Sequence, residues 1–273
     1  MINRAREVLK EYYGYDSFRE RQEEIITSIL EGKDVVTIMP TGGGKSICYQ
    51  VPALILDGLT IVISPLISLM KDQVDNIKNM GIKSAYINST LSENEIKSIL
   101  NDVIKNEVKI LYVAPERLES TEFLNLITRV KISQIAVDEA HCISQWGHDF
   151  RSSYRRISKF IDLLVYRPII TAFTATATEE VRRDIINLLR LNEPKIFITG
   201  FDRKNLKITI EKAVVKKQYI LDYINSSEGA SGIIYCATRK DVDIIYEMLI
   251  ANNIKGERYH AGLNDEERRV AQE

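Results

Sequence analysis

The chain has 273 residues, and its 37 basic and 38 acidic residues leave a formal net charge of −1. This balance excludes a polycationic nucleic-acid-binding tail, so any nucleic acid must bind through a local basic groove. Hydrophobic residues make up 45% and charged residues 27% of the chain, which is typical of a globular protein with an ordinary core.

Cysteine usage and the termini bear on the compartment. The three cysteines, Cys48, Cys142 and Cys236, form no C-x-x-C pair and predict neither a disulfide framework nor a zinc ribbon. The N-terminal stretch is charged and aromatic, and the sequence has no apolar run of 18 residues. We therefore expect a reduced, cytoplasmic protein without a membrane span, associated with the nucleoid if the source is bacterial.

Apolar, β-branched runs predict strands, and the amphipathic stretches between them predict helices. The predicted strands are 34–40, 59–65, 85–89, 108–115, 134–140, 169–177 and 195–200. The predicted helices are 19–31, 46–56, 66–79, 92–105, 120–130, 153–165 and 178–190. This alternation predicts an α/β fold with a parallel sheet and helices on both faces. Ligands of such sheets bind beyond the carboxyl ends of the strands.

A second alternation begins after Gly200. The polar segment 201–217 predicts a linker or a crossing strand, and strands at 231–238 and 255–262 are expected around a helix at 239–252. The last residues have the pattern of a helix interior. We therefore expect a first domain at 1–200 and the start of a second, truncated domain at 201–273.

The stretch MPTGGGKS, residues 39–46, lies between a predicted strand and a predicted helix. The strict P-loop pattern requires glycine where Met39 stands, so the match is incomplete. The glycines nevertheless allow a tight turn that directs N–H groups inward, and the helix adds its positive N-terminal end. The residues assigned to a bound nucleotide here are Thr41, Gly42, Gly43, Gly44, Lys45 and Ser46. The pattern favours a phosphate site over a plain flexible turn.

Two acids, Asp138 and Glu139, follow the strand predicted at 134–140. Phosphoryl transfer requires a carboxylate that holds Mg²⁺ and a group that positions the attacking water. Asp138 suits the first role, together with the Ser46 hydroxyl, and Glu139 suits the second as a general base. Lys45 would contact the β- and γ-phosphates. ATP and Mg²⁺ are therefore the expected ligands.

The stretch DEAHCISQWGHDFR, residues 138–151, continues from these acids and allows three interpretations. A metal site would use His141, Cys142 and His148, but the spacing of the histidines fits no ligand signature and no second cysteine lies near, which disfavours it. A core segment suits Ile143 but not the polar residues that follow it.

A DNA-contact loop is the third interpretation, and it is the one that we predict. Trp146 and Phe150 would offer stacking faces to bases, and Arg151 would contact a phosphate or an aromatic ring.

Longer motifs extend this interpretation, since together they resemble superfamily 2 helicases and, more closely, the RecQ family of DNA helicases. They are GYDSFRERQEEII (14–26), MPTGGGKS, SPLISLMKDQV (64–74), APERL (114–118), DEAHCISQWGHDFR, FTATAT (173–178) and FDRKNL (201–206). The resemblance implies two RecA-like domains. It also implies ATP-driven 3′-to-5′ movement on single-stranded DNA with duplex unwinding, in DNA repair and recombination.

The resemblance also assigns roles to individual residues. Tyr15 and Arg19 would sandwich adenine, and Gln22 would read its edge, which suits an aromatic face, a planar guanidinium and an amide. The aromatic-rich loop would couple DNA binding to ATP hydrolysis by repositioning the catalytic residues. The members of this coupling set are Glu139, His141, Gln145, Trp146, His148, Phe150 and Arg151.

Two further groups of residues are carried over from the family. Thr174 and Thr176 would link the state of the γ-phosphate to domain movement. The segments that face the single strand in the family contribute candidate contacts to its phosphates. These candidates are Ser64, Lys71, Glu116 and Arg117.

The chain departs from the family pattern at Lys204, where the family usually has proline, and in its length. The fifth and sixth family motifs are expected after residue 273, and the sixth supplies arginines to the ATP site. We therefore expect these 273 residues to bind nucleotide, to hydrolyse it poorly and to leave duplexes intact.

The alternatives to a DNA helicase are an RNA-acting superfamily 2 ATPase and an ATP-gated binding module. We expect a monomer, and the sequence identifies no protein partner.

Overall fold

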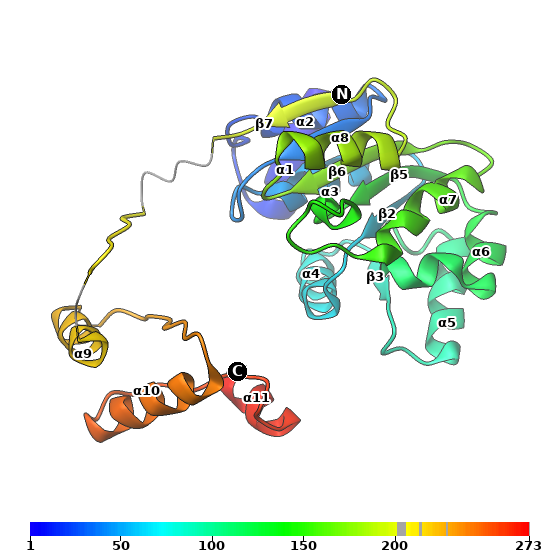
Figure 1. Cartoon of the computed structure of the whole chain (residues 1–273). Coiled ribbons are helices and arrows are strands. Elements are labelled where there is room, and N and C mark those ends of the chain that lie inside the picture. Colours follow the sequence, from blue (N-terminus) through cyan, green and yellow to red (C-terminus); the bar gives the residue numbers. More distant parts are fainter. Residues whose placement is uncertain (201–205, 213–214, 228, 273) are drawn as a thin grey trace. The chain divides into compact units, whose positions relative to one another are not determined.

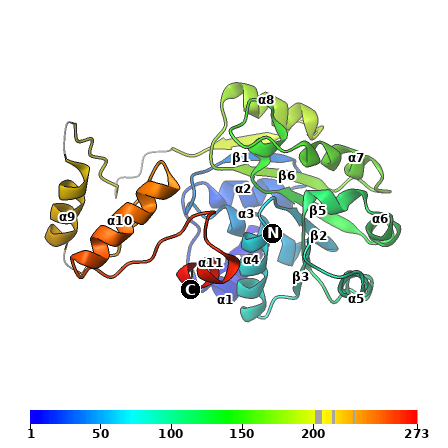
Figure 2. The same ribbon diagram turned by 60° about the horizontal axis from the view of Figure 1, so that its bottom comes forward.

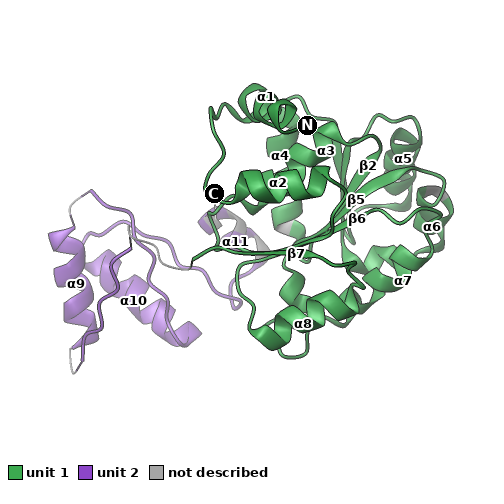
Figure 3. Cartoon of the chain, turned by 90° about the horizontal axis from the view of Figure 1, so that it is seen from above, with its two compact units in different colours: residues 1–202 green, residues 203–273 purple. Residues whose placement is uncertain are grey.

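The computed structural model describes residues 1–200, 206–212, 215–227 and 229–272. The chain divides into two compact units, Met1–Asp202 and Arg203–Glu273 (Figure 3). No helix in the described ranges is long and apolar enough to cross a membrane.

The first unit is built on one parallel sheet of seven strands in the order β3-β4-β2-β5-β6-β1-β7 (Figure 1). In chain order the strands are β1 (Val35–Ile38), β2 (Leu59–Ile63), β3 (Ser84–Ile87), β4 (Ile110–Val113), β5 (Ile132–Val137), β6 (Ile169–Thr174) and β7 (Lys195–Ile198). The predicted fold class is confirmed, and each of the seven strands predicted before residue 201 is present. Because the strands are parallel, β5, β6 and β1 bring three carboxyl ends side by side.

The helices of the first unit connect these strands. They are α1 (Ile2–Tyr13), α2 (Gln22–Leu30), α3 (Lys45–Ile55), α4 (Ile67–Asn79), α5 (Glu93–Ile104), α6 (Thr121–Ile127), α7 (Arg156–Asp162) and α8 (Glu179–Leu188). Short 3₁₀ turns occur at η1 (Pro115–Glu119), η2 (Ala140–Ile143) and η3 (Ser152–Arg155). Local sequence determines where some of these helices begin. At α5 the Ser92 hydroxyl and the Glu95 carboxylate form a capping box.

Alternation along the strands produces two core layers, one on each face of the sheet. On one face Val35 and Val62 pack against α2, α3 and α4. On the other face Val36 and Ile61 pack against α5, α6, α7 and α8. Figures 2 and 3 show these two groups of helices on opposite sides of the strands. The predicted cover of helices on both faces is therefore present.

Helix α1 forms an outer layer that the sequence patterns did not predict. Its buried residues Ala5, Val8 and Leu9 pack with Ile26 and Val51 of α2 and α3. The charged residues of the helix are exposed and its other apolar and aromatic residues are half-buried, so its fully buried stripe is narrow and easily missed.

The second unit contains α9 (Lys216–Ser226), α10 (Arg239–Ala251) and α11 (Asp265–Gln272). The helix predicted at 239–252 is confirmed. The strands predicted at 231–238 and 255–262 are wrong, because the structure assigns no strand to either range. A strand requires a hydrogen-bonded neighbour, and Ile233 and Tyr235 are instead exposed. In the predicted linker or crossing strand, 206–212 forms no strand, and 201–205 with Lys204 and 213–214 lie outside the described residues.

Candidate nucleotide and nucleic-acid site

Three adjacent strand ends bring the predicted ATP motifs together. The glycine loop follows β1, Thr174 ends β6, and Asp138 follows β5. The Met39 amide donates to the Thr174 carbonyl over 3.0 Å, which continues the β1–β6 ladder into the loop. Segments that are far apart in the sequence therefore meet at one edge of the sheet.

The glycine loop requires glycine for two separate reasons. Gly42 and Gly44 have φ angles of 79° and 87°, in the left-handed region that disfavours other residues. At Gly43 a Cβ atom would lie 2.5 Å from the Met39 Cγ atom, inside van der Waals contact. Thr41, which precedes these glycines, is exposed.

Met39, which breaks the strict P-loop pattern, is a buried core residue. Its carbonyl accepts a hydrogen bond from the Lys45 ammonium over 3.2 Å. The backbone of Met39 therefore belongs to the loop while its side chain belongs to the core, and this position does not need glycine.

The three predicted adenine contacts differ in their surroundings. Gln22 is buried, and its amide lies 3.3 Å from the carbonyls of both Gly43 and Gly44. The Arg19 guanidinium donates to the Gly42 carbonyl over 2.8 Å, and the Gln22 side-chain oxygen accepts from the Arg19 amide. Tyr15 is exposed. The segment before α2 thus braces the glycine loop through Arg19 and Gln22.

The pKa values of the two acids of the site are shifted in opposite directions. Burial, reinforced by the charge of Glu139, raises the pKa of Asp138 to about 6. A hydrogen bond from His141 lowers the pKa of Glu139. The ammonium of Lys45 lowers the pKa of both acids, although it is not the leading cause for either. Lys45 therefore lies close enough to both carboxylates to act on them.

Glu139 has the backbone angles φ 45° and ψ 46°, which are rarely adopted by a residue other than glycine. Two contacts hold this sharp turn. The Glu139 amide donates to the Asp138 carboxylate over 3.0 Å, and the Tyr154 hydroxyl donates to the Asp138 carbonyl over 2.8 Å. The turn directs the chain from β5 into η2.

His141 connects Glu139 to β6. Its Nδ1 atom lies 3.2 Å from a Glu139 carboxylate oxygen and 2.9 Å from the Thr174 hydroxyl. The Thr174 hydroxyl donates to the Thr176 carbonyl over 2.9 Å, so Nδ1 is the donor to Thr174. Both threonines named in the sequence analysis therefore join this network.

The loop after η2 folds back onto His141. The rings of His141 and His148 are stacked at 4.2 Å with an interplanar angle of 17°. The buried Ser144 hydroxyl donates to Asp184 of α8 over 2.6 Å, which fixes the base of the loop. The loop is thereby in contact with His141 through the side chain of His148 as well as through the backbone.

The tip of the loop is directed to solvent. Trp146 is 78% exposed, and Gln145 and Phe150 are also exposed. The guanidinium of Arg155 lies over the Phe150 ring, 5.3 Å from its centroid. Aromatic side chains with this exposure are available to stack on bases.

The remaining candidate DNA contacts lie at different depths. Ser64 is buried, so its hydroxyl does not face solvent in this conformation. The Arg117 side chain is half-buried and donates to the Asn88 carbonyl over 3.1 Å. Lys71 and Glu116 are exposed.

The oxygen donors present fit a magnesium ion. Mg²⁺ binds hydroxyl and carboxylate oxygens and leaves its remaining positions to water and phosphate. Ser46, half-buried in the first turn of α3, and Asp138 would provide one ligand of each kind. The pKa of Asp138 is raised because the positive charge of Lys45 does not fully offset the effects of burial and of the Glu139 charge.

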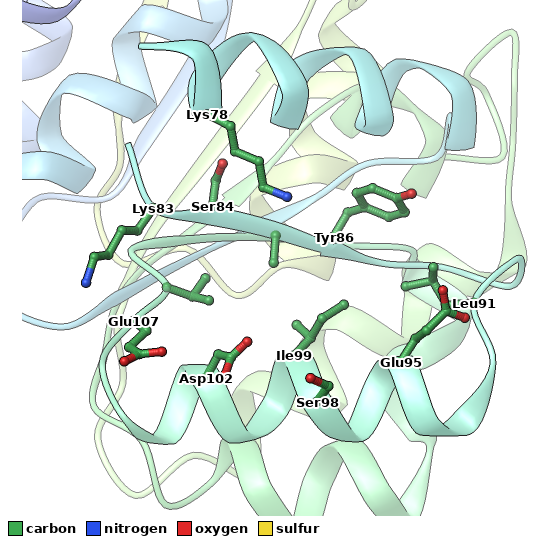
Figure 4. Close-up of a pocket in the computed structure, with 12 residues that line it drawn as sticks. Lys78, Lys83, Ser84, Tyr86, Leu91, Glu95, Ser98, Ile99, Asp102 and Glu107 are labelled. Atoms are coloured by element: carbon green, nitrogen blue, oxygen red, sulfur yellow. The ribbon is translucent and has the colours of Figure 1, made fainter. Parts of the chain in front are cut away.

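A cavity of about 730 Å³ lies away from this site, between α4, the edge strand β3 and α5 (Figure 4). Its polar lining includes Lys78, Ser84, Glu95 and Asp102. None of the predicted site residues lines this cavity, so it has no part in the site described above.

Some residues of the site were missed by the sequence analysis. Tyr154 holds the Asp138 carbonyl, and Asp184 holds Ser144, although neither lies in a predicted motif. Arg155 lies four residues beyond the predicted loop, on the Phe150 ring. No sequence signal marks such partners, because each contact depends on where a separate element packs.

Fold and site together place the chain in the class of RecA-like α/β proteins, with a glycine loop between β1 and α3. A family profile described as "DEAD/DEAH box helicase" matches residues 19–184. The chain therefore belongs to the DEAD/DEAH box helicase family.

Among curated proteins, the chain is similar to RecQ DNA helicases. It is 48% identical over 274 aligned residues to the ATP-dependent DNA helicase RecQ of Bacillus subtilis, covering 100% of this chain and 46% of the relative. It is 44% identical over 268 residues to RecQ of Pasteurella multocida, covering 98% and 42%. The chain thus spans less than half the length of these relatives.

Solved helicase structures share the fold at low sequence identity. The helicase MrfA bound to DNA matches with a TM-score of 0.73 at 17% identity, covering 98% of this chain and 42% of that one. A DEAD-box helicase bound to single-stranded RNA and UDP-BeF matches with a TM-score of 0.69 at 18% identity, covering 97% and 60%. At this identity the likeness shows the fold alone.

Proposed function

We propose that this chain is the nucleotide-binding part of an ATP-dependent DNA helicase of the RecQ type, which moves 3′ to 5′ on single-stranded DNA. The observation that carries the proposal is the contact network from the acids to the exposed loop. His141 lies within 3.2 Å of Glu139 and stacks on His148. The imidazole rings of His141 and His148 thereby connect Glu139, the hydrolytic residue of this proposal, to the aromatic loop that would bind DNA.

Nucleotide binding begins with the base. Tyr15 and the Arg19 guanidinium enclose adenine, and the Gln22 amide pairs with its edge. The glycine-loop amides and the N-terminus of α3 bind the phosphates, with Lys45 at the β- and γ-phosphates. The contacts of Arg19 and Gln22 with the glycine-loop carbonyls give the base and phosphate sites a shared support.

Ser46 and Asp138 would hold Mg²⁺, which would neutralise charge on the phosphates. Glu139 accepts a proton from the attacking water. Its lowered pKa keeps this carboxylate ionised at neutral pH, the form that a general base requires. His141 holds the Glu139 carboxylate in place and connects it to Thr174.

The loop couples DNA binding to ATP hydrolysis in this proposal. Bases of the single strand stack on Trp146 and Phe150, and this displaces the backbone around Gln145 and His148. Because His148 packs on His141, the displacement changes the position of His141 relative to Glu139 and Thr174. DNA binding thereby changes the rate of ATP hydrolysis.

The test is the ATPase activity of the full-length parent protein with and without single-stranded DNA. We expect Lys45→Ala to abolish activity in both conditions. Trp146→Ala and Phe150→Ala should retain the basal rate and lose most of the stimulation by DNA. Tyr166→Ala removes an aromatic side chain that is equally exposed and outside the loop, and it should behave as wild type. Full stimulation in both loop variants would contradict the coupling role.

Substrate class and chain length are tested in the same assay. RNA and DNA strands of equal sequence distinguish a DNA helicase from an RNA-acting ATPase, since RNA recognition uses 2′-hydroxyl groups. We expect residues 1–273 alone to bind nucleotide and hydrolyse it slowly, because an arginine from a second domain can contribute about 10³–10⁵ in rate. The proposal includes a monomeric, cytoplasmic protein acting in DNA repair and recombination.

A further inference from the structure

The DNA-contact loop carries two arginines whose surroundings differ. Arg151, the arginine of the predicted motif, is engaged within the protein. Its Nε and Nη2 atoms donate to one Asp149 carboxylate oxygen over 3.1 and 3.0 Å, and its Nη1 atom donates to the Pro65 carbonyl over 2.9 Å. The Asp149 carboxylate offsets its charge, and the bond to Pro65 ties the loop to the segment after β2.

Arg155, one helical turn further along the chain, is differently placed. Its side chain is exposed, and its guanidinium packs on the Phe150 ring at 5.3 Å from the centroid. No carboxylate in the described ranges lies within ion-pair distance of it. An arginine held on an aromatic ring has fewer rotamers to lose on binding, and its full charge faces solvent.

The adjacent Arg156 provides a natural comparison. It forms an ion pair with Glu119 over 3.1 Å, with a side chain that is partly exposed. These two neighbouring arginines therefore differ in their availability to an anion, because a carboxylate neutralises Arg156 but not Arg155.

Single-strand-binding surfaces combine aromatic side chains that stack on bases with cations that track the phosphates. The exposed rings of Trp146 and Phe150 provide the first part, and Arg155 on the Phe150 ring provides the second. A planar guanidinium donates two parallel N–H groups to a phosphate, which a carbonyl-bound arginine such as Arg151 does less readily.

We infer that Arg155 is a further DNA-binding residue, which contacts a phosphate of the strand whose bases stack on Trp146 and Phe150. Arg151 instead acts as a positioning residue that holds the loop through Asp149 and Pro65. This inference rests on the proposed function of the loop, and it moves the phosphate contact four residues beyond the family motif.

The experiment measures binding of a fluorescent oligothymidylate to the full-length parent over a range of salt concentrations. Removing one phosphate contact to a single strand reduces the slope of log K against log salt by about 0.7, and weakens binding about fivefold at 0.1 M salt. We expect this from Arg155→Gln, whereas Arg155→Lys should keep the slope. Arg156→Gln is the matched control and should also keep it. The basal ATPase rate of Arg156→Gln should equal that of wild type, because Arg156 pairs with Glu119 and has no role in the proposed site.

Two further variants separate the possible failures. Trp146→Ala tests the loop itself, and Arg151→Gln tests the competing assignment. If Arg155→Gln keeps the wild-type slope while Trp146→Ala weakens binding, the inference is wrong and the loop role stands. A slope lost in Arg151→Gln but not in Arg155→Gln also overturns it. If neither Trp146→Ala nor Arg155→Gln affects binding, the proposed function of the loop fails as well.

Discussion

At the scale of single residues, Gly147 determines how the exposed loop meets the proposed ATP site. Its amide donates to the Ser144 carbonyl over 3.1 Å, which closes a tight turn. A Cβ atom at this position would lie 2.4 Å from the His141 carbonyl oxygen, a backbone atom that cannot rotate away. The absence of a side chain thus allows the chain to reverse and place His148 on His141.

We therefore predict that Gly147→Ala displaces the turn and weakens the stacking of His148 on His141. The variant should lose about 1–3 kcal/mol of stability, as overpacked substitutions do. Stimulation of the parent protein's ATPase by DNA should fall several-fold while its basal rate changes little. Gly200→Ala, at a glycine with open space around it, is the control for thermal unfolding and ATPase assays. Unchanged stimulation in Gly147→Ala would show that the turn does not control coupling.

At the scale of elements, a buried carboxylate joins three segments at the amino edge of the sheet, opposite the proposed ATP site. Asp34, just before β1, accepts hydrogen bonds from the Arg167 guanidinium, the Ile170 amide at 2.9 Å and the Asn192 amide at 2.7 Å. These donors belong to the segment before β6, to β6 itself and to the turn between α8 and β7. One side chain thereby aligns the two strands that flank β1.

Asp34→Ala should lower the free energy of unfolding by about 3–5 kcal/mol, because it leaves a partly buried guanidinium and two amides without their acceptor. Asp57→Ala is the matched control, since Asp57 pairs with Lys131 at the surface with a side chain 92% exposed. That change should cost less than about 1 kcal/mol. Urea unfolding of both variants measures the difference, and equal losses would contradict the structural role of Asp34.

At the scale of the whole molecule, the two units differ in how far they bury their apolar side chains. The first unit buries its strand residues on both faces of the sheet. In the second unit Ile208, Ile210, Ile233 and Tyr235 are each at least 80% exposed. Exposed apolar side chains in a continuous segment are unusual for a soluble surface and favour association or dye binding.

We predict that residues 1–273 bind the dye ANS, and that a chain ending at Asp202 binds much less of it while keeping a cooperative thermal transition. The reason is that the first unit contains its own complete core. Dye fluorescence and calorimetry of the two chains provide the measurements. Equal dye binding would place the exposed apolar surface in the first unit, contrary to the expectation.

Much of the fold was predictable because its signals are local. The strand runs of the first unit are nearly continuous in apolar residues, and each was placed within a few residues of its position. The glycine loop was recognisable because strand, glycines and lysine are contiguous. The strands predicted at 231–238 and 255–262 failed because periodicity reports a tendency to be buried, whereas a strand also requires a partner.

The sequence by itself determined the α/β class, the glycine loop, the paired acids and the aromatic loop, since each is written in adjacent residues. Only the tertiary structure decided which side chains meet across elements. It buries Ser64, places Asp184 on Ser144, occupies Arg151 with Asp149, and leaves Arg155 on the Phe150 ring. The physical reason is that hydrogen bonds and ion pairs act over a few ångströms in space, whatever the separation of the residues along the chain.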